Sequence, residues 1–200
     1  MLHLRAHHRP ALDVIVVKRK PIYYNKRYSE VMYHKIVTEI CEKYGKKYSK
    51  ELEIKVSILG AERLLRHLYD YNIPMALATN STEQAVNLHA TARPKLFGMF
   101  SHKVSATDPE VDRGKPNPDI YLVAAARFPS KPKPSNCLVF EDSKIGVDAA
   151  REAGMQVVMI PDRRLERELT RHATLVLRSL LDFKPELFGL PPFDNTKDSK

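Results

Sequence analysis

Long apolar runs and paired cysteines are both missing from this sequence of 200 residues. No stretch approaches the roughly 18 apolar residues that a membrane-spanning helix needs, so we expect no membrane partner. The opening MLHLRAHHRP lacks the apolar region of a secretory signal peptide, and we expect a cytoplasmic protein. Cys41 and Cys137 lie far apart and form no CxxC pair, which argues against a zinc site or a disulfide framework.

The composition that remains is that of a globular domain with a strong positive charge. With 43% hydrophobic residues the chain can build a sizeable core. The net charge of +9 favours contact with polyanions at long range. The basic residues are spread along the chain, with one cluster in VKRKP (17–21), and no nucleic-acid motif accompanies them. We therefore expect a solvated basic surface and no nucleic-acid partner; the alternative is a basic site for a small phosphorylated molecule.

Apolar strands alternate with helical patterns along most of the chain. Helices are expected over 25–45, 60–72, 81–92, 116–128, 145–154 and 178–183, and strands over 13–17, 73–79, 99–106, 137–142, 155–162 and 173–177. A polar hinge is expected over 46–55. The strands are apolar without alternation, which indicates an α/β, Rossmann-like parallel sheet with helices on both faces.

Three short features stand at places where such a sheet binds ligands, beyond the carboxyl ends of its strands. Thr79 and Asn80 end one strand, Glu141 and Asp142 end another, and Lys115 precedes a helix. Each feature alone has an ordinary structural explanation. A threonine or aspartate after a strand is commonly a helix cap, and a lysine before proline is commonly exposed to solvent. Their order and spacing together are more specific.

The strings PMALATNS, GKPNPDIYL, CLVFEDSKIGVDAA, AGMQVVMIPD and DFKPELFGLP carry a resemblance. From Ile58 to Leu190 the chain resembles the haloacid dehalogenase-like phosphatases, most closely the pseudouridine-5'-phosphatase family. The resemblance implies hydrolysis of a small phosphomonoester, a nucleotide such as pseudouridine 5'-phosphate. In that family the reaction passes through an aspartyl-phosphate with help from Mg²⁺.

The resemblance also implies a role for each of the five site residues. Thr79 would hold a phosphoryl oxygen, and Asn80 would add an amide donor. Lys115 would neutralise charge on the phosphoryl group. Glu141 and Asp142 would be the Mg²⁺ ligands, since this ion prefers oxygen donors and commonly rests on one or two carboxylates.

The family's first motif, DxDG, supplies the nucleophile, and no DxD occurs in this sequence. Aligning the segment RYSEV with the family places the two aspartate positions on Val16 and Lys18. Asp13 begins the same strand, so we expect it at the opposite edge of the sheet. Lys18 is expected near the mouth of the site, where it would partly replace the metal as counter-charge for Glu141 and Asp142 and weaken Mg²⁺ binding.

The resemblance divides the chain into five parts: a disordered tail (1–12), the first core strand with a basic loop (13–24), a reduced helical cap remnant (25–57), the haloacid dehalogenase-like core (58–190) and a flexible tail (191–200). The missing motif leaves two functions open. One is the phosphatase of the family; the other is a truncated isoform or pseudophosphatase that at most binds a phosphorylated ligand. The oligomeric state is left open by the sequence.

Overall fold

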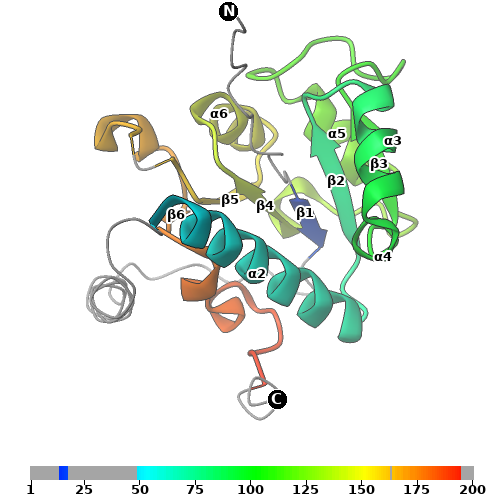
Figure 1. Ribbon diagram of the computed structural model, residues 1–200. Helices are drawn as coiled ribbons and strands as arrows, with labels where there is room; N and C mark the ends of the chain where they lie inside the picture. Colours follow the sequence, from blue (N-terminus) through cyan, green and yellow to red (C-terminus); the bar gives the residue numbers. More distant parts are fainter. Residues whose placement is uncertain (1–13, 18–48, 163, 195–200) are drawn as a thin grey trace, which may run out of the picture.

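A six-stranded sheet with helices on both faces forms the described part of the chain (Figure 1). The structure is a computed structural model that describes residues 14–17, 49–162 and 164–194. The strands are β1 (Val14–Val17), β2 (Met75–Thr79), β3 (His102–Ser105), β4 (Cys137–Glu141), β5 (Gln156–Met159) and β6 (Leu175–Val176). The α-helices are α2 (Ser49–Asp70), α3 (Glu83–Ala92), α4 (Pro94–Phe97), α5 (Asp119–Ala126) and α6 (Lys144–Glu152). Short 3₁₀ helices are η2 (Pro134–Asn136), η3 (Arg167–Thr170), η4 (Leu180–Asp182) and η5 (Pro185–Phe188).

The two faces of the sheet are packed by different elements. On β2, Met75 and Leu77 belong to a cluster with the buried leucines of α2 and with the segments η4 and η5. The alternate residues Ala76 and Ala78 belong to a second cluster with α5 and α6. This period of two follows from the strand pleat. The predicted α/β architecture with helices on both faces is confirmed.

The strand order is β3-β2-β1-β4-β5-β6, and β1 runs against its neighbours. The pairs β2·β3, β4·β5 and β5·β6 are parallel, whereas β1 is antiparallel to both β2 and β4. The expectation of a parallel sheet is therefore wrong for this strand. VIVV consists of four β-branched residues and reads almost alike in both directions, so its pattern predicts a strand without predicting the strand's direction.

The reversal changes which end of β1 lies near the predicted site. The register pairs Val14 with Leu77 and Phe140, and Val16 with Met75 and Leu138. The beginning of β1 thus lies at the edge where β2 and β4 end, and Val16 lies toward the opposite edge. The placement of Val16 at the site is therefore wrong. Asp13 is expected far from the site only if β1 runs parallel to its neighbours, and this condition does not hold. Asp13 and Lys18 themselves lie outside the described residues.

The helix before β2 also differs from the expectation. α2 is continuous from Ser49 to Asp70 and crosses both the expected hinge and the boundary expected at residue 58. The helix expected over 25–45 lies outside the described residues. After η5 the chain packs on α2: His67 Nε2 lies 2.8 Å from the Pro191 carbonyl oxygen, and the His67 and Phe193 rings are 4.6 Å apart.

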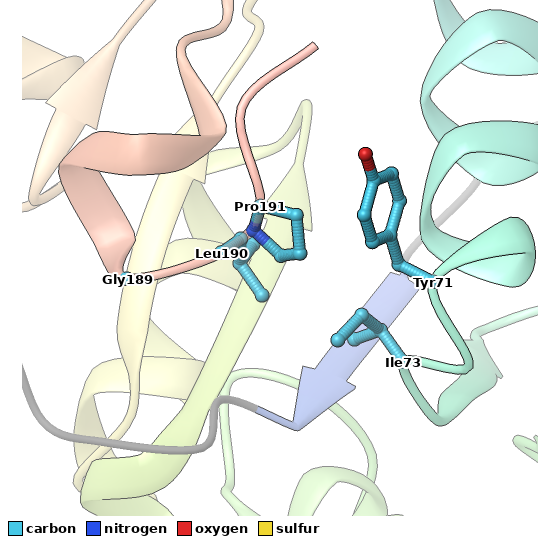
Figure 2. A pocket seen from close by; sticks show the side chains of 5 residues that line it. All are labelled: Tyr71, Ile73, Gly189, Leu190 and Pro191. Carbon is cyan, nitrogen blue, oxygen red and sulfur yellow. The ribbon is translucent and has the colours of Figure 1, made fainter. Parts of the chain in front are cut away.

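A small pocket lies at the amino end of β2, away from Thr79. Its volume is about 270 Å³, and Figure 2 shows the rings of Tyr71 and Pro191 on opposite walls. Ile73, Gly189 and Leu190 complete the lining. The lining has no charged side chain, so this pocket is a poor site for a phosphate. No helix in the part of the chain that the structure describes is long and apolar enough to cross a membrane.

Candidate functional site

At the end of β2, Thr79 lies in the protein interior and Asn80 lies on the surface. Thr79 is buried, and its Oγ1 accepts a hydrogen bond from the Ser81 N–H at 3.2 Å. Asn80 is exposed. Helix α3 is capped by Thr82, whose Oγ1 accepts from the Ala85 N–H at 3.3 Å. Thr79 is therefore not the helix cap.

Lys115 connects the ends of β2 and β4. Its Nζ lies 2.7 Å from Glu141 Oε1 and donates to the Ala78 carbonyl oxygen at 3.5 Å. The Lys115 side chain is 2% exposed, so the alternative of a solvent-exposed lysine is wrong. An ammonium is buried only when partners offset the loss of hydration, and here a carboxylate and a carbonyl do so.

The Glu141 carboxylate is held on both oxygens. Oε1 accepts from Lys115 Nζ and from the Tyr121 hydroxyl at 2.6 Å. Oε2 accepts from the backbone N–H groups of Asp142 and Ser143, both at 3.1 Å, and from Ser143 Oγ at 3.0 Å. A carboxylate offers about four acceptor positions, so this one has little capacity left. We interpret Glu141 as the counter-ion of Lys115.

The first turn of α6 closes over this carboxylate. Ser143 caps the helix, since its Oγ accepts from the Gly146 N–H at 3.1 Å. Gly146 is buried, and a Cβ there would lie 1.7 Å from Glu141 Oε1. The string EDSKIG therefore combines the carboxylate, the cap that binds it and the glycine that leaves space for it.

Opposing effects act on the pKa of Glu141. Burial raises it, but the Lys115 ammonium and the hydrogen bonds from Lys115, Tyr121 and Ser143 outweigh burial, so the pKa lies below its ordinary value. Glu141 is therefore ionised at neutral pH, as an ion pair with Lys115 requires.

This lowered pKa predicts a loss of stability in acid. The stabilisation is fully present above the ordinary glutamate pKa of 4.5 and is lost as the pH falls from there toward the lower pKa of the folded state. Urea unfolding measured from about pH 7 to about pH 3 should show this decline, and Glu141→Gln should reduce its slope. An equal slope in the variant would contradict the assignment.

Among the described residues, the donor set at this edge does not by itself fit a resident Mg²⁺. Glu141 is occupied by its five hydrogen bonds, and Asp142 is the exposed carboxylate beside it. Across the described ranges no group of three His, Cys, Asp or Glu side chains is arranged to hold a metal. Lys115 is a counter-charge for Glu141; the part expected of Lys18 stays a prediction, since that residue lies outside the described ranges.

All five predicted site residues belong to one edge of the sheet. Lys115 contacts Glu141 and the backbone next to Thr79, while Asn80 and Asp142 follow β2 and β4 as exposed residues. The site residues predicted from the sequence do not include Tyr121, Ser143 and Gly146. The EDSKIG string offered a signal for Ser143 and Gly146, as a cap and a small residue. Tyr121 had none, because PDIYL reads as an ordinary buried helix.

Comparisons with known proteins show which family this chain resembles. The model of the haloacid dehalogenase-like hydrolases matches residues 25–154. A probable pseudouridine-5'-phosphatase of Drosophila melanogaster is 61% identical over 135 residues, which are 67% of this chain and 58% of that protein. The mitochondrial (DL)-glycerol-3-phosphatase 1 of Arabidopsis thaliana is 47% identical over 138 residues, 68% of this chain and 46% of that protein.

A solved structure is also similar. CbbY from Rhodobacter sphaeroides, in complex with phosphate, has a TM-score of 0.53 at 25% identity, covering 60% of this chain and 53% of that one. The chain thus spans about half the length of these relatives.

Proposed function

Because this chain belongs to the haloacid dehalogenase-like hydrolase family, we propose that it binds a small phosphomonoester where β2 and β4 end. The relatives' names point to this ligand class, since one is a probable pseudouridine-5'-phosphatase and another a glycerol-3-phosphatase. With 61% identity to the former, a nucleotide such as pseudouridine 5'-phosphate is the first candidate.

The buried Lys115 ammonium carries this proposal. It is held 3.5 Å from the Ala78 carbonyl oxygen, one residue before Thr79. A fixed positive charge at this place attracts a phosphoryl group electrostatically, even where the ammonium itself stays buried. In the proposed complex the Thr79 hydroxyl and the Asn80 amide donate to phosphoryl oxygens, and Lys115 offsets their charge.

Hydrolysis is the function of the family, and it needs a carboxylate nucleophile and an acid/base. The sequence lacks the DxD that supplies both, and Glu141 is occupied by Lys115 and Tyr121. Mg²⁺, when bound in this family, offsets phosphoryl charge; here Asp142 is the exposed carboxylate beside Glu141. These contacts favour ligand binding without turnover, and we expect Mg²⁺ to add little to phosphate affinity.

Calorimetry with inorganic phosphate and with pseudouridine 5'-phosphate, each with and without Mg²⁺, tests the proposal. We expect both ligands to bind without the metal. Thr79→Val and Asn80→Ala should each weaken binding about tenfold, because each removes a donor to a charged group. Thr91→Val is the matched control, since Thr91 lies in the last turn of α3 and donates to the Asn87 carbonyl.

Two results would change the conclusion. No binding of either ligand at up to about 10 mM would overturn the proposed site. Release of phosphate from pseudouridine 5'-phosphate that requires Mg²⁺ and is lost in Thr79→Val would show that the chain is a phosphatase.

A further inference from the structure

Tyr121 contacts both members of the buried ion pair. Its hydroxyl donates to Glu141 Oε1 at 2.6 Å, and the Lys115 Nζ lies 4.7 Å from the centre of its ring. Tyr121 itself is fully buried on α5. We infer that Tyr121 is a positioning residue that keeps Lys115 available to a phosphoryl group by sharing the Glu141 oxygen that the lysine contacts. This inference rests on the proposed function.

The geometry explains why a shared oxygen matters. Lys115 Nζ and the Tyr121 hydroxyl both approach Oε1, at 2.7 Å and 2.6 Å. A hydrogen bond to a carboxylate oxygen withdraws part of its charge, so Oε1 attracts the ammonium less strongly than it would alone. The lysine therefore keeps part of its positive potential for an incoming anion.

The ring of Tyr121 contributes in a second way. An ammonium within about 6 Å of an aromatic face is attracted by the ring quadrupole. At 4.7 Å the ring gives Lys115 Nζ a partner that does not compete for its N–H donors as an anion would. The hydroxyl and the ring together let Lys115 stay buried at this edge without full neutralisation by Glu141.

Tyr121→Phe isolates the hydroxyl. The ring and its contact with Lys115 remain, and Glu141 Oε1 keeps Lys115 as a donor, so no buried acceptor loses its last partner. Glu141 should then hold Lys115 more tightly. We expect inorganic phosphate to bind about tenfold more weakly, because hydrogen bonds to charged groups contribute on this scale. Tyr69→Phe is the control, since Tyr69 is 56% exposed on α2.

A rescue experiment separates positioning from a structural role. If Tyr121 acts by weakening the attraction of Glu141 for Lys115, then Glu141→Gln in the Tyr121→Phe background should recover most of the phosphate affinity. The free energy of unfolding should not recover in that double variant. A structural role predicts that affinity and stability fall together and that the double variant is the weakest binder.

A second measurement covers the case in which the double variant does not fold. In ¹⁵N-lysine spectra of the wild type, we expect the Lys115 ammonium signal to move when phosphate is added, and to move less in Tyr121→Phe at equal occupancy. Equal affinity and an equal shift in Tyr121→Phe would overturn the inference while the proposed function stands. Failure of the wild type to bind phosphate would overturn both.

Discussion

Gly146→Ala is expected to destabilise the protein by about 3 kcal/mol, because it overpacks a buried site that has no room to relax. The new Cβ would lie 1.7 Å from Glu141 Oε1 and 2.3 Å from Oε2. The carboxylate is held by Lys115, Tyr121 and Ser143, so it must give up hydrogen bonds or α6 must shift. Urea unfolding at neutral pH measures the loss.

Gly114→Ala is the matched control for this prediction. Gly114 lies just before Lys115, and a Cβ there would meet nothing within 4 Å. We expect a change within about 0.5 kcal/mol, as for surface substitutions in general. Equal losses in the two variants would show that the contact between Gly146 and Glu141 is not the cause.

Lys115→Met is expected to cost about 3–5 kcal/mol of stability, because it leaves a buried carboxylate without its cation. Glu141 and Lys115 are 1% and 2% exposed, so water does not replace the missing partner. The pKa of Glu141 should rise in the variant, since the ammonium no longer favours the ionised form. The difference in stability between wild type and variant should therefore shrink from about pH 7 to about pH 4.

Lys144→Met tests whether burial is the reason that the ion pair of Lys115 and Glu141 contributes so much stability. Lys144 pairs with Asp148 one turn along α6, where the side chains are 41% and 25% exposed. Exposed pairs of this kind contribute about 1 kcal/mol or less. A loss from Lys144→Met as large as that from Lys115→Met would contradict the interpretation of Lys115 and Glu141 as a buried functional pair. Phosphate binding should be weakened in Lys115→Met and unchanged in Lys144→Met.

Local patterns in the sequence predicted the strands and helices that surround the site. β2 and β4 are short apolar runs that end at polar residues, and the structure ends them at Thr79 and Glu141. α6 begins where Ser143 can cap it. These features are local, because pleat, capping and turn preferences act over a few neighbouring residues.

The hinge expected over 46–55 shows where local patterns fail. The segment is polar, yet α2 runs through it from Ser49. Polar residues are compatible with a solvated helix as well as with a loop, so composition alone does not distinguish them. The RSLLDF segment shows the reverse case, since the structure has only the 3₁₀ turn η4 there.

The family, the α/β class and the strand ends where Thr79, Asn80, Glu141 and Asp142 lie could all be predicted from the sequence alone. Three features became evident only in the folded chain: β1 runs antiparallel to its neighbours, Lys115 is buried against Glu141, and Tyr121 and Gly146 pack around this ion pair. The physical reason is the distance along the chain over which the deciding interactions act. Apolar pattern and capping are read from neighbours in the chain, whereas the direction of a strand and the partner of a buried charge depend on residues brought together from distant segments.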